Sequence, residues 1–289
     1  MSKEHPDYND SRYFNFHDQS ENITGFMRVG TKPNRSEKSL FFFLMTADRV
    51  MGIKTTEIIT NERYFCKSME FIPLENDYWS LSYNGPLQDS TGKIYNVKMD
   101  LKWKPLNEEF DYRECVTGRN VEISAMVASK HYEQFGAITG SLCIDGEELK
   151  ISGLGERDHS QGVRDWGAPK NWLWINSQFS ETEAFNITKL EMDQGIVDSG
   201  FFHYEGINRP ITSIDVSIKE SDSKIPISFT LEIKDDNGKN YSVVGTVIRK
   251  AIMPFQGSDG AESIIVETLS EYMWDGKKGY GVAEFLYRL

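Results

Sequence analysis

The sequence lacks the features of membrane-spanning, secreted and nucleic-acid-binding proteins. No apolar run approaches the roughly 20 residues that span a bilayer, and the polar start Met1–Ser11 has no apolar signal segment. The formal net charge of -12 repels phosphate backbones, and no stripe of Lys and Arg offsets it. These absences predict a cytoplasmic protein that is not transmembrane and binds no nucleic acid, while peripheral contact with a membrane stays open.

Cysteine and helical periodicity are scarce as well. Cys66, Cys115 and Cys143 form no Cys-x-x-Cys pair, and bridging two would leave one over, which predicts reduced, mostly buried thiols. No segment shows three turns of an amphipathic helix. Gly153-x-Gly155 precedes no helix pattern and Ser160 lacks a Gly-x-Ser-x-Gly setting, so neither a dinucleotide fingerprint nor a nucleophile elbow is supported.

The sequence does contain segments in which apolar and polar residues alternate with a period of two. Apolar and polar residues alternate over Tyr95–Lys104 and again over Ile227–Lys234, which predicts strands with one buried face. The turn Asp145-Gly146 predicts a tight hairpin between 141–144 and 147–152. Further strands are expected at 40–45, 121–127, 171–179, 184–190, 200–204, 214–219, 241–247, 264–274 and 280–287.

Many strands separated by Gly, Asn and Asp turns predict an all-β protein with antiparallel sandwich or barrel architecture. A length of 289 residues suits two halves of barrel size. No Pro/Ser-rich linker is present, and the best division lies near Ile151–Gly155. We therefore expect an N-terminal β domain at 1–152 and a C-terminal β domain at 153–289.

The stretch 153–167 stands apart because the alternation fails there. It contains two Arg-Asp pairs, Arg157-Asp158 and Arg164-Asp165, with His159 beside the first and Trp166 after the second. Trp172 and Trp174 follow on one face of a predicted strand. A carboxyl group against indole rings loses hydration of its charged form and keeps a proton near neutrality, and aromatic faces stabilise a developing cation. The stretch thus has the ingredients of acid chemistry in a dry pocket.

Structural interpretations of the same residues stay open. Arg-Asp pairs often tie an irregular segment to carbonyls and carboxylates, and His159 is as readily a hydrogen-bonded structural histidine. Trp172 and Trp174 also suit ordinary core packing. His131 and Glu133 share one side of a predicted strand and face either a cavity or solvent. No spaced histidine companion indicates a metal site, and no cofactor is expected.

The segment Gly155-Glu156-Arg157-Asp158-His159-Ser160-Gln161-Gly162-Val163-Arg164-Asp165-Trp166 resembles the signature of the hydroxyneurosporene synthase (carotenoid hydratase)-like and AttH-type proteins. The stretches 11–16, 131–134 and 279–285 and the Asp145-Gly146 hairpin are similar too, so the resemblance covers most of the chain. It implies two tandem antiparallel lipocalin-like barrels or half-barrels. Relatives in this superfamily include carotenoid hydratases, terpene cyclases and pericyclases.

The resemblance implies a cofactor-independent hydratase, cyclase or isomerase for an apolar isoprenoid or polyene-like molecule. Asp158 would protonate an alkene with His159 as its partner, and Gln161 replaces the tryptophan usual in the family. The residues expected at the site are the catalytic Asp158, His159 and Asp165, the orienting Arg157 and Arg164, and the substrate-binding Trp166, Trp172, Trp174, Gln161, His131 and Glu133.

Two rival interpretations follow from the same sequence. The first is a lipocalin-like carrier of a hydrophobic ligand, in which the charged stretch only braces the fold. The second is a structural or regulatory protein with a filled core. None of the three interpretations, enzyme, carrier or structural protein, determines the oligomeric state.

Overall fold

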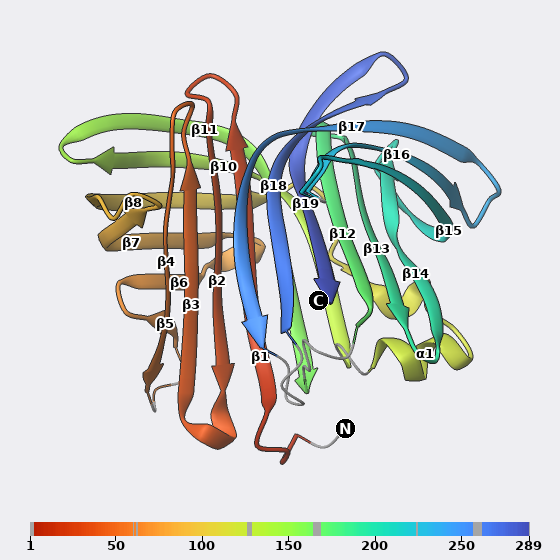
Figure 1. Ribbon diagram of the computed structural model, residues 1–289, viewed down its shortest axis with the longest axis horizontal. Helices are drawn as coiled ribbons and strands as arrows, with labels where there is room; N and C mark the ends of the chain where they lie inside the picture. Colours follow the sequence, from red (N-terminus) through yellow and green to blue (C-terminus); the bar gives the residue numbers. More distant parts are fainter. Residues whose placement is uncertain are drawn as a thin grey trace. The chain divides into compact units, whose positions relative to one another are not determined.

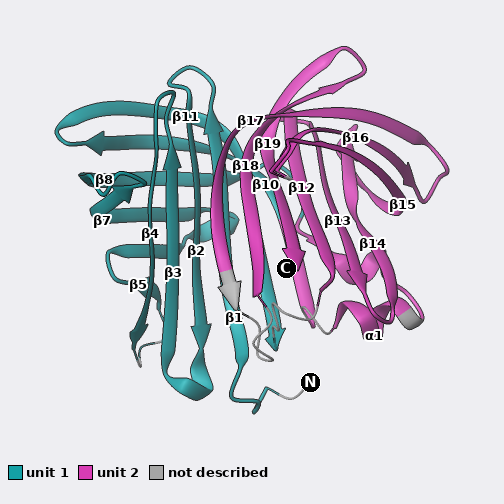
Figure 2. Ribbon diagram, viewed as in Figure 1, with its two compact units in different colours: residues 1–108, 134–163 teal, residues 109–133, 164–289 magenta. Residues whose placement is uncertain are grey.

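The computed structural model describes residues 3–59, 61, 63–125, 129–163, 169–223, 225–256 and 262–288. The described residues form an almost entirely antiparallel β structure, which confirms the predicted fold class (Figure 1). They divide into two compact units: unit 1 comprises 1–108 and 134–163, and unit 2 comprises 109–133 and 164–289 (Figure 2). Both units are discontinuous in sequence. The division into two continuous domains, 1–152 and 153–289, stays a prediction.

Unit 1 is a sheet in which hydrogen-bonded neighbours follow the order β4-β3-β2-β1-β11-β10-β8-β7-β6-β5. Strand β4 also pairs with β7 through Met51 and Gly52, so the strands from β4 round to β7 close into a ring. The elements are β1 (Tyr8–Asp18), β2 (Ile23–Lys32), η1 (Pro33–Arg35), β3 (Glu37–Met45), β4 (Val50–Ile58), β5 (Tyr64–Cys66), β6 (Met69–Pro73), η2 (Glu75–Asp77), β7 (Trp79–Asp89), β8 (Ile94–Pro105), β10 (Lys130–Ile144), which begins in unit 2, and β11 (Glu147–Val163).

The alternation in the sequence sets the faces of these strands. In β8, Tyr95, Val97, Met99, Leu101 and Trp103 are buried while the intervening residues are exposed, as predicted. They join an apolar core inside unit 1 with Phe14, Phe42 and Leu81, among others. The hairpin between β10 and β11 turns at Asp145 and Gly146, whose φ angles of 50° and 92° are those that the Asp-Gly pair predicts.

Unit 2 is a closed barrel of strands β12 to β19 in sequence order. Its interior is apolar and rich in aromatic side chains, including Phe185, Phe202 and Tyr272. The elements are β9 (Phe110–Asp111), η3 (Tyr112–Glu114), α1 (Arg119–Ser124), β12 (Asn171–Ser180), β13 (Glu183–Met192), β14 (Gly195–Tyr204), β15 (Ile207–Glu220), β16 (Pro226–Asp235), β17 (Asn240–Gln256), β18 (Glu262–Trp274) and β19 (Lys277–Arg288).

Strand β11 corrects one expectation. The loss of alternation predicts an interruption of the strand pattern after Gly153 and Gly155, but the charged stretch continues as regular strand to Val163. Residues on both faces of β11 are buried, including Glu156, Arg157 and Ser160, so alternation between apolar and polar residues is lost although the backbone stays extended. A side chain at Gly155 would lie 1.9 Å from the carbonyl oxygen of Asn15, which explains the glycine.

Helix α1 corrects a second expectation, because Val121–Ser124 is helical where a strand was expected at 121–127. The helix buries Ile123, which lies against Gly195 of β14, and leaves Val121 exposed. This tertiary contact overrides the β propensity of Val121 and Ile123.

The three cysteines are free, as expected, and Cys66 is buried while Cys115 and Cys143 are partly buried. Among the described residues, no helix has the length and apolar character needed to cross a membrane.

Candidate functional site: a cavity in unit 2

Unit 2 contains a cavity of about 100 Å³. Apolar side chains from three neighbouring strands form one part of its wall: Trp172 of β12, Leu190 of β13 and Val197 of β14. Tyr112, His131 and Thr188 add polar groups. An apolar cavity of about 150 Å³ is known to hold benzene, so this cavity has the scale of a ring-sized part of a ligand.

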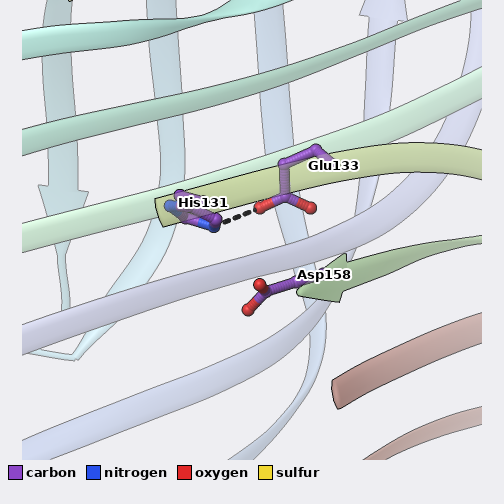
Figure 3. Close-up of side chains that lie close together, drawn as sticks. All are labelled: His131, Glu133 and Asp158. Carbon is purple, nitrogen blue, oxygen red and sulfur yellow. Dashed lines mark ion pairs between the residues drawn. The ribbon is translucent and has the colours of Figure 1, made fainter. Parts of the chain in front are cut away.

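His131 and Glu133 form an ion-pair contact at this cavity. The two residues lie two positions apart on β10, so their side chains share a face, and the His131 Nε2 atom is 2.7 Å from the Glu133 Oε1 atom (Figure 3). Trp174 Nε1 donates a hydrogen bond of 2.9 Å to the same carboxylate oxygen. Glu133 is fully buried, and an ionised carboxylate in that position needs such donors. The pair thus orients an imidazole at the cavity wall.

Tyr112 fixes the other side of this imidazole. Its ring centroid lies 4.3 Å from that of His131, and its hydroxyl group donates to Asn186 Oδ1 and lies 3.0 Å from Thr188 Oγ1. The 3-10 helix η3 follows Asp111, whose carboxylate accepts a hydrogen bond of 3.0 Å from the Arg113 backbone N–H. Strand β9 then pairs with β10 through Asp111 and Tyr132, which brings Tyr112 and His131 together.

A pair of acidic residues lies on two neighbouring barrel strands. Glu267 of β18 and Glu284 of β19 are directly opposite one another, and Glu284 is opposite Trp174 of β12. Glu267 is fully buried. Burial, followed by repulsion from the Glu284 carboxylate and a hydrogen bond with it, raises the pKa of Glu267 well above its usual range. Glu267 therefore keeps its proton to a higher pH than an ordinary glutamate does.

In unit 1, the motif residues of β11 point alternately to two faces. Asp158 accepts a hydrogen bond of 2.5 Å from Ser160 Oγ, so these two side chains share one face. His159 Nε2 lies 3.0 Å from Asp10 Oδ1 on β1, and Gln161 Nε2 donates to Asp10 Oδ2 at 2.7 Å. Adjacent strand residues point in opposite directions, so the His159 imidazole and the Asp158 carboxyl lie on opposite faces of β11.

Arg157 is buried on the same face as His159. Its Nε atom donates to Gln134 Oε1 at 2.8 Å, and its guanidinium lies 5.9 Å from the ring centre of Trp79 and 5.6 Å from that of Trp103. These contacts hold the guanidinium inside unit 1, and the orienting of Asp158 by Arg157 stays a prediction. Arg164, Asp165 and Trp166 lie outside the described residues.

Of the residues singled out in the sequence, unit 2 brings together His131, Glu133, Trp172 and Trp174. His131 and Trp172 line the cavity, and Trp174 holds Glu133. Histidine and glutamate are also residue types that bind metals. Sequence reasoning missed Tyr112, Thr188, Leu190 and Val197. Tyr112 and Asn186 are 74 residues apart, and no local pattern indicates their contact.

Solved structures with the same fold come from several proteins. A protein described as AttH from Nitrosomonas europaea matches with a TM-score of 0.69 and 11% identity, over 96% of this chain and 92% of that chain. CghA in complex with Sch210972 matches with a TM-score of 0.64 and 10% identity, over 98% and 89%. Kievitone hydratase from Nectria haematococca matches with a TM-score of 0.55 and 12% identity, over 96% and 88%.

These likenesses confirm the predicted resemblance to AttH-type proteins at the level of the fold. None of the curated protein sequences is similar enough to this chain to count as a match. The model of one family, described as a domain of unknown function (DUF7064), matches residues 1–287. The chain therefore belongs to the DUF7064 family.

Proposed function

We propose that this protein is a cofactor-independent hydratase or cyclase that binds an apolar small molecule in the cavity of unit 2. The observation on which the proposal rests is the His131–Glu133 pair at a wall otherwise built from residues such as Trp172 and Leu190. A ligand held there contacts apolar surface, the oriented His131 imidazole and polar groups such as those of Tyr112 and Thr188.

The pair suits proton transfer to or from carbon. An imidazole held by a carboxylate has a fixed orientation and exchanges protons near neutral pH, and general acid-base help of this kind contributes about 10²–10⁴-fold. Trp174 keeps Glu133 in place through its indole N–H. In this proposal, His131 transfers the proton and Glu133 and Trp174 are positioning residues.

The neighbours with the same fold support the proposed reaction class. One of them is a hydratase and another was solved with the compound Sch210972 bound. Identities of 10% to 12% establish the common fold alone, so hydratase or cyclase activity is proposed for this chain. An isoprenoid or polyene-like substrate stays part of the proposal.

Asp158 remains a second candidate for the proton donor, as the motif suggests. Its carboxyl group is held by Ser160 at 2.5 Å. The roles assigned to His159, Arg164, Asp165, Trp166 and Gln161 remain proposals as well.

The experiment is proton exchange or addition at carbon, measured in D₂O by mass spectrometry with geraniol and β-ionone as probes. Wild-type protein is expected to introduce deuterium into at least one probe. His131→Gln is expected to lower that rate about 10²–10⁴-fold. Glu133→Gln leaves the imidazole without its charged partner and is expected to lower the rate less. Asp158→Asn measures the contribution of the motif carboxyl.

His203→Gln is the matched control. His203 is a buried histidine of β14 whose Nδ1 atom lies 2.8 Å from Asn208 Oδ1, so the substitution tests the loss of an imidazole elsewhere in the same barrel. It is expected to leave deuterium incorporation unchanged. Equal rates for His131→Gln and wild type would contradict the role of His131.

A carrier of an apolar ligand is the alternative, and the apolar wall of Trp172, Leu190 and Val197 favours it equally. Extraction of the purified protein followed by mass spectrometry identifies any bound compound. A ligand that binds unchanged to wild type and to His131→Gln, with no deuterium incorporation in either, would establish the carrier.

A further inference from the structure

Two buried side-chain amides lie opposite one another on neighbouring strands of unit 2. Asn176 of β12 and Asn186 of β13 are paired in register, and their exposed fractions are 3% and 0%. Directly opposite residues of paired strands project from the same face with their Cβ atoms about 5 Å apart. The two amides therefore form one polar patch.

The oxygen atoms of both amides are used, but the nitrogen atoms are not. Asn176 Oδ1 accepts a hydrogen bond of 3.3 Å from the Val282 backbone N–H, and Asn186 Oδ1 accepts from the Tyr112 hydroxyl group. Within the described part of the chain, neither Nδ2 atom has a hydrogen-bond partner. An unsatisfied buried donor costs about 1–3 kcal/mol, so two side by side require an explanation.

The patch adjoins the proposed site through Tyr112 and Thr188. Thr188 lies two positions from Asn186 on β13 and projects from the same face, and both Thr188 and Tyr112 line the cavity. The Tyr112 hydroxyl group links Asn186 to Thr188, and its ring lies against His131. Asn186 thus lies next to two residues of the cavity wall, and Asn176 lies opposite Asn186 on β12.

We propose that the Nδ2 groups of Asn176 and Asn186 are the oxygen-binding subsite of this cavity. They would donate hydrogen bonds to a carbonyl or hydroxyl oxygen of the ligand. This inference rests on the proposed function and narrows its substrate class, from apolar molecules in general to apolar molecules with such an oxygen. Two N–H donors on one carbonyl oxygen also polarise the neighbouring carbon atoms, where His131 would exchange a proton.

Acetophenone and ethylbenzene test the subsite because they have similar size and differ in the carbonyl group. Ligand-observed NMR titration gives the two dissociation constants. Wild-type protein is expected to bind acetophenone about 10-fold more tightly, as two modest hydrogen bonds predict. Asn176→Asp and Asn186→Asp keep an acceptor for Val282 and Tyr112 but remove the amide N–H groups, and each is expected to reduce the preference to about 2-fold or less.

Asn15→Asp in unit 1 is the matched control. Asn15 is also buried, its Oδ1 atom accepts from the Glu156 backbone N–H at 3.2 Å, and its Nδ2 atom has no partner among the described residues. The control is expected to keep the preference for acetophenone. Should a buried aspartate prevent folding, Asn186→Leu provides a second variant with the same expected loss of preference.

The outcomes separate this inference from the proposed function. Equal affinity of wild-type protein for both compounds would overturn the oxygen subsite and leave the cavity intact. Failure of both compounds to bind would contradict the cavity as a ligand site, and with it both proposals.

Discussion

The two units share one arrangement of neighbouring strands, in which a glycine lies against an asparagine of the partner strand. In unit 1, a Cβ atom at Gly155 would lie 1.9 Å from the Asn15 carbonyl oxygen, and Asn15 Oδ1 accepts from the next backbone N–H, that of Glu156. In unit 2, a Cβ atom at Gly281 would lie 2.0 Å from the Asn176 carbonyl oxygen, and Asn176 Oδ1 accepts from Val282. A close approach between neighbouring strands thus requires glycine, and an asparagine on the partner strand secures it, in both units.

The interiors of the units differ. Unit 1 places the Arg157 guanidinium beside Trp79 and Trp103, whereas the interior of unit 2 is apolar, with Phe202 and Tyr241 stacked at 4.0 Å. The cavity in unit 2 is built from other residues. The Arg-Asp-His motif is carried by unit 1, whereas the residues that line the cavity belong to unit 2.

Alanine at Gly155 or Gly281 is expected to have the largest effect on the free energy of unfolding. The two substitutions test whether the glycine–asparagine arrangement matters equally in both units. Gly155→Ala and Gly281→Ala both force a Cβ atom into a backbone oxygen, which cannot move aside as a flexible side chain can. Each is expected to lower the free energy of unfolding by about 3 kcal/mol or more. Urea denaturation measures both values.

The control for this pair is Gly276→Asn, at a turn with φ of 72° and no atom within 4 Å of an added Cβ. Asparagine tolerates this conformation, so a loss below about 1 kcal/mol is expected. A large loss at only one of Gly155 and Gly281 would break the equivalence of the two units.

Arg157→Met tests whether the guanidinium inside unit 1 stabilises that unit. Methionine keeps the apolar stem but loses the hydrogen bond to Gln134 and the contacts of the cation with two indole rings. A loss of about 2 kcal/mol in the free energy of unfolding is expected. Arg209→Met is the control, since Arg209 lies 3.8 Å from an exposed Glu205 and is expected to contribute less than about 1 kcal/mol. Unchanged stability of Arg157→Met would remove the structural role.

Glu267→Gln is expected to have the smallest effect on the free energy of unfolding, and the size of that effect depends on pH. The folded-state pKa of Glu267 is raised, first by burial and then by Glu284, so the folded protein keeps a proton that the unfolded chain releases above its usual pKa of 4.5. Stability therefore falls as the pH rises from that value through the raised pKa. On β17, Ala251 is opposite Glu267, Lys250 is opposite Thr268, and Arg249, two positions from Ala251, is opposite Leu269.

The amide of glutamine needs no proton, so Glu267→Gln is expected to be more stable than wild type at pH 8, by about 1 kcal/mol, and close to wild type at pH 4. Urea denaturation at the two pH values gives the difference. An equal dependence on pH in wild type and variant would contradict the buried proton.

Strands with one solvent-exposed face were predictable from the sequence. Alternation over Tyr95–Lys104 predicts β8, and Asp145-Gly146 predicts the turn between β10 and β11, because each signal is local. Strand β11 was harder to read, since both of its faces are buried at Glu156 and Arg157. Helix α1 was missed because its position depends on the contact of Ile123 with β14.

The cavity was only partly predictable. His131 and Glu133 were singled out by their spacing of two, and Trp172 and Trp174 by theirs. Their common neighbours Tyr112, Thr188 and Asn186 come together through pairing of distant segments, which no local pattern encodes. Nor does the sequence reveal that His159 contacts Asp10, 149 residues earlier in the chain.

The central claim is that the cavity of unit 2 is the ligand site, and a crystal structure of the protein soaked with acetophenone tests it most directly. The account predicts electron density for the ring against Trp172, Leu190 and Val197, with His131 beside it. A ligand bound elsewhere in the protein while this cavity holds only water would contradict the account.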